Sequence, residues 1–188
     1  MNSQIINYMG IFLLVSLGVF VGCGGDDTDS TPEAPTLIQL KVMDGYILDA
    51  NVSFKGKSFI WDGNVTYESY TSAINTEDVF LSTGGIHDLN GNSLIDNEDV
   101  HAVDMKAPAN YRNINPFTTL LVENKHLSAQ NLLDYFSSVE GVYLGDINDV
   151  NGFDIDIVKA STGVEGNPEI MRQAAILTLL FSIVKTSE

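Results

Sequence analysis

Oxygen-bearing side chains at alternating positions mark one segment of the chain as a candidate cation site. Residues 88, 90 and 92 are Asp, Asn and Asn, and further acids follow at 96, 98 and 99. Carboxylate and amide oxygens on residues 88, 90 and 92 can converge on one hard cation, such as calcium. From residue 88 to the next Lys or Arg, which is Lys106, the chain has five acids: Asp88, Asp96, Glu98, Asp99 and Asp104. Their mutual repulsion favours a bound counter-ion.

The spacing of residues 88–99, the acidic loop, resembles the twelve-residue calcium loop of EF-hand and dockerin proteins. That resemblance implies calcium as the cofactor, with these ligands: Asp88, Asn90, Asn92, the carbonyl of Leu94, Asp96 through water, and Asp99. It also implies that Ile95 points into the core. Ser93 stands where such loops usually have glycine, and Asp99 closes the loop as in dockerins. The short closing carboxylate predicts a weak site, on the order of 10⁻⁴–10⁻³ M.

The segments around the acidic loop do not form a paired EF-hand. Residues 79–85 favour a strand and a turn where an EF-hand has a helix, and we expect a single helical turn from Val100. The alternative interpretation is a hairpin turn on Asn90-Gly91 with a solvated acidic face.

A second acidic cluster consists of Asp146, Asp149, Asp154 and Asp156, and its spacing differs from that of the acidic loop. We expect these residues to serve in helix caps and turns, with a metal site as the alternative.

The N-terminal 22 residues contain no charged side chain, although the 188-residue chain carries a net charge of −16. The apolar run Ile11–Val21 has the length of a secretory signal rather than of a membrane-spanning helix. Val21-Gly22-Cys23-Gly24 resembles a bacterial lipobox. That resemblance implies cleavage of residues 1–22, lipid attachment to Cys23, and, because Gly24 follows, the outer membrane or cell surface. Residues 23–36 then form a flexible acidic tether. The alternative is an uncleaved N-terminal anchor, since residues 1–9 lack Lys and Arg.

Residues 37–115 show the alternating pattern of short strands. Candidate strands cover residues 37–42, 46–48, 52–54, 58–61, 65–70 and 79–81, with Asp44-Gly45 as a turn. Leu40–Phe54 resembles the opening of carboxypeptidase regulatory-like and collagen-adhesin B-type sandwich repeats. Met105–Asn110 and Ile114–Leu121 are similar to the join between such a sandwich and a helical segment in large bacterial surface proteins. These resemblances imply a small antiparallel β-sandwich with a structural or adhesive role.

Residues 116–188 show helical spacing and predict an α-helical subdomain, which makes the fold class α+β. We expect helices over 118–124, after a cap at Ser128, and from Asn167-Pro168 to about Lys185. Phe153–Ile157 is expected to dock against them. The last helix is apolar around most of its circumference, which predicts burial. Leu179 and Ile183 are left over for a partner or a further domain.

The composition argues against several classes of function. Nucleic-acid binding is disfavoured by 25 acids against 9 bases, and a single cysteine excludes a disulfide framework. No phosphate loop or helical histidine pair is present, although His87 and His101 flank the acidic loop and leave a transition-metal role open. We therefore expect a lipid-anchored, calcium-stabilised envelope module that is not an enzyme, with a surface protein or glycan as ligand. The alternative is a carbohydrate-binding or glycan-hydrolysing lipoprotein that uses Trp61, Tyr67 and Tyr70 as a stacking surface.

Overall fold

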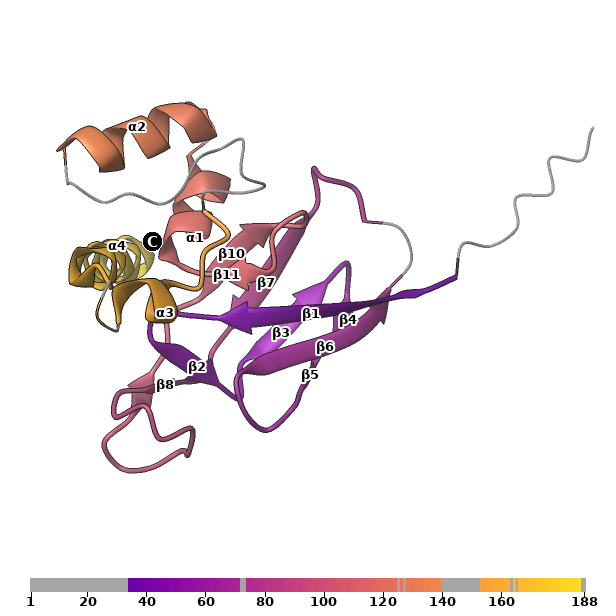
Figure 1. Cartoon of the computed structure of the whole chain (residues 1–188). Coiled ribbons are helices and arrows are strands. Elements are labelled where there is room, and N and C mark those ends of the chain that lie inside the picture. Colours follow the sequence, from indigo (N-terminus) through magenta and orange to yellow (C-terminus); the bar gives the residue numbers. More distant parts are fainter. Residues whose placement is uncertain are drawn as a thin grey trace, which may run out of the picture. The chain divides into compact units, whose positions relative to one another are not determined.

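The computed structural model describes residues 34–71, 74–124, 126, 128–139, 153–162, 164 and 166–186. In this part of the chain eleven strands precede four helices, and the predicted α+β class is confirmed (Figure 1). The strands are β1 (Thr36–Val42), β2 (Tyr46–Leu48), β3 (Asn51–Phe54), β4 (Lys57–Ser58), β5 (Ile60–Trp61), β6 (Thr66–Thr71), β7 (Val79–Thr83), β8 (Ile86–Asp88), β9 (Val100–His101), β10 (Met105–Pro108) and β11 (Asn113–Ile114). The helices are α1 (Pro116–Glu123), α2 (Ala129–Val139), α3 (Ile157–Ser161) and α4 (Pro168–Thr186).

Two four-stranded sheets give the strands a sandwich-like arrangement. The first has the order β11-β1-β6-β5 and the second β10-β7-β3-β4. All their pairings are antiparallel except that of β1 with β11. Leu40 and Tyr67 from the first sheet join Val52 and Phe80 from the second in one buried cluster. Because successive side chains of a strand point to opposite faces of a sheet, the alternating apolar residues place one apolar face of each sheet in a shared core.

The segment expected to be one strand over residues 58–61 is divided at Phe59. Its two parts, β4 and β5, belong to different sheets. Phe59 is buried and meets the edge of Phe80, with ring centroids 5.7 Å apart. With this aromatic side chain buried at the crossing point, the chain leaves the second sheet after β4 and enters the first sheet at β5.

A buried polar cluster, here called the junction, connects the sandwich to the helices. Asn115 caps α1: its side chain accepts the Thr118 N–H at 2.9 Å, and the Thr118 hydroxyl accepts the Asn115 N–H at 2.9 Å. The Thr118 and Thr119 hydroxyls donate to the Lys106 carbonyl in β10, at 2.9 and 3.2 Å. Because Pro116 suits the first helical position, α1 starts there, two residues before the predicted start.

The remaining helices enlarge the same core. Ser128 accepts the Asn131 N–H at 3.2 Å and so caps α2 as predicted. Phe136 of α2 meets Phe117 of α1 edge-on at 5.2 Å. Phe153 and Ile157 are buried, as expected for a segment that docks on the helices. Ile157 begins α3, a short helix that the sequence pattern did not predict and that packs on α4.

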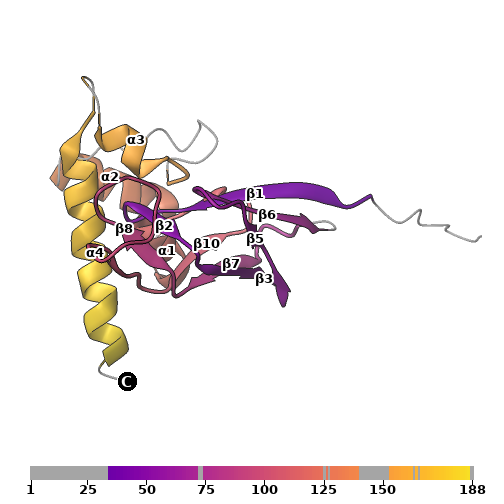
Figure 2. The same cartoon turned by 90° about the horizontal axis from the view of Figure 1, so that it is seen from below.

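Helix α4 begins at Pro168, as predicted, but only one side of it is buried. Ile170, Ala174 and Leu177 belong to the core, whereas Ile176, Leu180 and Val184 are exposed. The expectation of near-complete burial is therefore wrong for the C-terminal half, which continues past the other helices (Figure 2). Among the described helices, none is long and apolar enough to cross a membrane.

Candidate metal centre

The acidic loop is carried by a third, three-stranded sheet with the order β2-β8-β9. Asp88 is the last residue of β8 and pairs with Tyr46 of β2. The chain returns in β9, where Val100 lies opposite His87 and His101 opposite Ile86. The helical turn expected from Val100 is therefore wrong, since this residue is in a strand. The loop connects two antiparallel strands, which agrees with the hairpin alternative in its connectivity.

Asp88 organises the first half of the acidic loop. Its side chain is buried, and its two carboxylate oxygens accept backbone N–H groups from Gly91 at 2.7 Å, Asn92 at 3.2 Å and Ser93 at 2.8 Å. Ser93 has φ = 59°, so the chain makes a left-handed turn at the position where such loops usually have glycine. The serine has therefore not removed the sharp turn, and the loop wraps around the first carboxylate.

The predicted ligands 90, 92 and 96 meet directly. The side-chain amides of Asn90 and Asn92 each donate to one oxygen of Asp96, both at 3.0 Å. The other Asp96 oxygen accepts the Glu98 N–H at 2.9 Å. These bonds, the Glu98 N–H first and the two amides next, hold the pKa of Asp96 below its usual range. Asp96 is thus kept ionised at the centre of a polar cluster.

Asp99 closes the loop, because each of its two carboxylate oxygens accepts a backbone N–H group of the loop. One oxygen accepts the Leu89 N–H at 3.1 Å and the other accepts the Asp96 N–H at 2.9 Å. Leu94 joins the network through its own N–H, which donates to Asn92 at 2.7 Å. Five of the six predicted ligands therefore share a hydrogen-bond network through their side chains, and the sixth enters it through its backbone.

One prediction for this loop fails. Ile95 was expected in the core, but its side chain is 50% exposed, as are Leu89 at 55% and Leu94 at 66%. The loop extends beyond the three-stranded sheet, so no core surface lies beneath its second half (Figure 1). Ile95 is thus half exposed where a paired loop would bury it.

In the part of the chain that the structure describes, no basic side chain neutralises the charge of the acidic loop. Among the described Lys, Arg and His residues, none forms an ion pair with Asp88, Asp96, Glu98 or Asp99. In the same part of the chain, no three His, Cys, Asp or Glu side chains are grouped as metal ligands. A cation here would therefore draw on amide and backbone oxygens as well as carboxylates, the mixture that suits calcium.

The two histidines beside the loop do not form a pair. His87 and His101 lie opposite neighbouring residues of the β8–β9 ladder, so their side chains leave opposite faces of the sheet. His87 packs on Gly45, which has φ = 80° and no room for a Cβ atom. Nearby, burial raises the pKa of the Asp44 carboxyl, and a hydrogen bond with Thr178 and the charge of His87 oppose that rise. His87 is thus part of the packing between β8 and the Asp44-Gly45 turn.

The second acidic cluster is divided by the limits of the described structure. Asp146 and Asp149 lie outside the described residues. Asp156 caps α3 through the Lys159 N–H and binds Lys41 Nζ at 2.8 Å, as expected for a helix cap. Asp154 accepts the backbone N–H groups of Arg112 at 2.7 Å and Asn113 at 2.6 Å. These two acids therefore fasten the segment before α3 to β11 and β1.

The proposed aromatic stacking surface is not assembled. Tyr67 is fully buried; its hydroxyl donates to Ile47 O at 2.8 Å and accepts the Ala50 N–H at 2.9 Å, and burial raises its pKa to about 12. Trp61 is partly buried against the core and donates its indole N–H to Asn64 O at 2.7 Å. Of the three aromatic residues, only Tyr70 is largely exposed. The structure therefore assigns Tyr67 to the core and not to a binding face.

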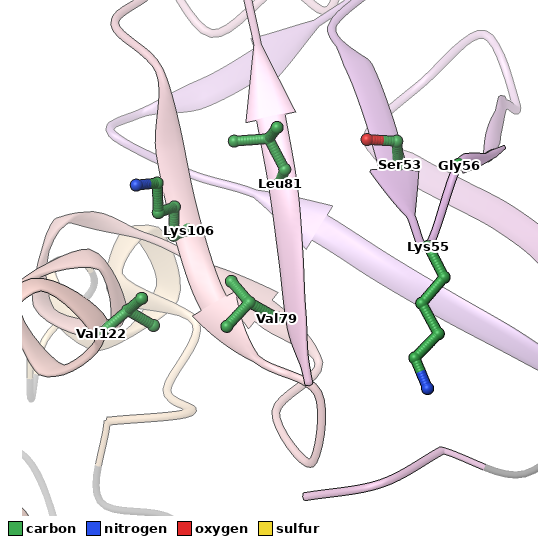
Figure 3. Close-up of a pocket in the computed structure, with 7 residues that line it drawn as sticks. All are labelled: Ser53, Lys55, Gly56, Val79, Leu81, Lys106 and Val122. Atoms are coloured by element: carbon green, nitrogen blue, oxygen red, sulfur yellow. The ribbon is translucent and has the colours of Figure 1, made fainter. Parts of the chain in front are cut away.

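A shallow hollow lies on the outer face of the second sheet. It measures about 440 Å³ and is lined by Ser53, Lys55, Gly56, Val79, Leu81, Lys106 and Val122 (Figure 3). The two lysines lie on either side of Val79 and Leu81. Each is already paired, Lys55 with Asp78 and Lys106 with Glu123, both at 2.6 Å. The hollow thus offers an apolar floor with neutralised charges and no convergent polar group that would select a ligand.

No family model, curated protein or solved structure matches the chain.

Proposed function

We propose that this chain is a lipid-anchored module of the bacterial cell envelope, displayed at the outer membrane or cell surface and stabilised by calcium bound in the acidic loop. Its role is structural, adhesive or ligand-binding rather than catalytic, with a surface protein or a glycan as ligand. The observation that carries the proposal is the acidic loop itself. Five side chains with the spacing of a calcium loop share one network, and no described base neutralises its acids.

The donor set fits calcium better than a transition metal. Asp88, Asn90, Asn92, Asp96 and Asp99 present oxygen atoms, and calcium takes six to eight oxygen ligands with flexible geometry. An asparagine amide can present either its nitrogen or its oxygen from the same position. The two amides that now donate to Asp96 therefore reach the centre of the cluster and, after rotation, would turn acceptors towards a cation. Bound calcium would then replace the amide protons as the positive partner of Asp96.

Thermal unfolding with and without calcium tests this proposal. A site with a dissociation constant of 10⁻⁴–10⁻³ M stabilises the native state by about 1.5–2.5 kcal/mol at about 10 mM calcium. For a chain of this size we expect Tm to rise by about 3–10 °C. An equal concentration of magnesium, which tolerates this loose geometry poorly, should give a smaller rise. A Tm that is the same in excess calcium and in chelator would contradict the proposal.

The anchor is tested separately, because Cys23 lies outside the described residues. Mass spectrometry of the protein extracted from membranes should find a chain that begins at Cys23 with acyl groups attached. Cys23→Ala should leave an uncleaved, unlipidated chain. A native protein that retains residues 1–22 and an unmodified thiol would support the alternative N-terminal anchor instead.

A further inference from the structure

Helix α4 has two apolar sides, and only one of them belongs to the core. Ile170, Ala174 and Leu177 are buried against the rest of the protein. On another side four aliphatic residues are between 38% and 60% exposed: Ile176, Leu179, Leu180 and Ile183. Figure 2 shows that the C-terminal half of α4 continues past the other helices. These four residues are called the outer stripe below.

The outer stripe has the spacing and charge of a docking face. Its positions follow i, i+3, i+4 and i+7, the pattern with which an amphipathic helix covers one apolar surface. No charged residue occurs from Gln173 to Val184, in a chain with 25 acids and 9 bases. An exposed, uncharged apolar surface of this kind marks an interaction site for protein or lipid.

We propose that the outer stripe lies in the interfacial layer of a lipid bilayer, as a second membrane contact in addition to the anchor. The inference rests on the proposed lipid anchor at Cys23. Because the inner side of α4 is held by the core, the helix can offer lipid only one face, parallel to the membrane plane. Neutral, zwitterionic lipid suits the stripe, since the chain's net charge of −16 is repelled by anionic headgroups.

Size favours lipid over a second protein molecule. A stable protein interface uses about 20–30 residues on each side, far more than the four of the outer stripe. A tethered contact needs much less affinity. Residues 24–35 between Cys23 and the first strand span at most about 40 Å, which keeps the domain near the bilayer at an effective concentration on the order of millimolar. A small apolar patch is therefore sufficient for lipid, whereas it is insufficient for a freely diffusing partner.

Fluorescence quenching by brominated lipid tests the inference on the full chain. In a Trp61→Phe background, which removes the single native tryptophan, Leu180→Trp places a probe on the outer stripe, and Leu179→Trp repeats the test at a second position. Ile60→Trp is the matched control, since Ile60 is 76% exposed and belongs to β5, which lies apart from α4 (Figure 2). The purified proteins are reconstituted on phosphatidylcholine vesicles with or without bromine on the acyl chains. Circular dichroism confirms that each variant is folded.

We expect the probes at 179 and 180 to be quenched at least about twofold by bromolipid, since interfacial helices bury their apolar face 5–10 Å deep, and the probe at 60 to be unaffected. Equal quenching at all three positions, or none while the protein floats with the vesicles, overturns the inference. A blue shift that grows with protein concentration without quenching also overturns it and assigns the stripe to a second copy. Flotation itself reports on the anchor, so loss of flotation identifies failure of the proposed function.

Discussion

The junction and the acidic loop both bind backbone groups with polar side chains, but they differ in burial and charge. Each gathers polar side chains around backbone groups that have no partner in a strand or helix. At the junction, Asn115, Thr118 and Thr119 are buried, neutral, and bonded to one another and to Lys106. In the acidic loop Asp88 alone of the predicted ligands is buried, and the charge is carried by carboxylates that lie mostly in solvent.

The difference lies in what completes each network. Every polar side chain named at the junction has a hydrogen-bond partner within the protein, so folding alone completes this network. The acidic loop satisfies its own backbone N–H groups but leaves the negative charges of four acids without a described basic partner. Fixed dipoles stabilise the carboxylates individually, as they do for Asp96, whereas a counter-ion would also lower the repulsion among adjacent carboxylates. Changes at the junction should therefore affect unfolding under all conditions, and changes in the loop only when calcium is present.

Phe117→Ala should have the largest effect, because Phe117 is fully buried beneath the junction and meets Phe136 edge-on. Replacing a buried phenylalanine with alanine costs about 3–5 kcal/mol from lost burial and the cavity that remains. Urea unfolding should show this loss equally in calcium and in chelator. Phe117→Leu is the milder companion and should lose less. A loss of stability that calcium restores in Phe117→Ala would break the comparison.

Asn115→Ala should come next, since it removes the α1 cap and the donor to Phe153 O at 3.1 Å. A lost N-cap together with unpaired buried groups is expected to cost about 2–4 kcal/mol. Ser128→Ala is the matched control: it removes the cap of α2, which is exposed, and should cost about 1 kcal/mol. Equal losses in the two variants would mean that burial adds nothing to the cap at the junction.

The fold was predictable from sequence where one pattern dominated. Alternation located β1, β3, β6 and β7, and Ser128 and Asn167-Pro168 marked the starts of α2 and α4. The misses have local causes. β9 has only two residues, too few for any periodicity, and its pairing with β8 depends on the whole loop between them. Phe59 interrupts an apparently continuous strand because its aromatic ring is needed in the core.

The candidate metal centre was predictable in its members but not in its surroundings. Alternating oxygens are a local property, so spacing alone identified the residues that now share one network. Whether Ile95 is buried depends on what lies beneath the loop, and this is decided by residues far away in the sequence. The junction was missed as a polar cluster because Lys106 contributes its backbone carbonyl, which leaves no signal in residue types.

Asp99→Asn tests whether the stabilisation by calcium depends on the acidic loop. The amide removes the closing negative charge and keeps one acceptor oxygen, so it retains one of the two backbone bonds, to Leu89 or to Asp96. In chelator we expect a small fall in Tm from the one lost hydrogen bond, whereas the calcium-induced rise of about 3–10 °C should fall by more than half. Asp62→Asn is the matched control, because Asp62 also accepts two backbone N–H groups in an exposed turn. A calcium response that survives in Asp99→Asn, or that is lost in Asp62→Asn, would separate calcium from the acidic loop.

The smallest effect is expected for Asp154→Asn, beside the junction. Asp154 accepts the N–H groups of Arg112 and Asn113, and burial raises its pKa above the usual value although those bonds oppose the rise. A carboxyl whose pKa is higher in the folded state binds its proton more tightly there, so its contribution to stability is full below about pH 4 and is lost as pH rises through the folded pKa. Asparagine retains an acceptor oxygen without a charge to desolvate. We therefore expect Asp154→Asn to match the wild type near pH 4 and to be slightly more stable at pH 7, measured by urea midpoints at both values. A variant that is clearly less stable at pH 7 would show that the negative charge itself is needed at this position, which would make this edge of the junction resemble the acidic loop.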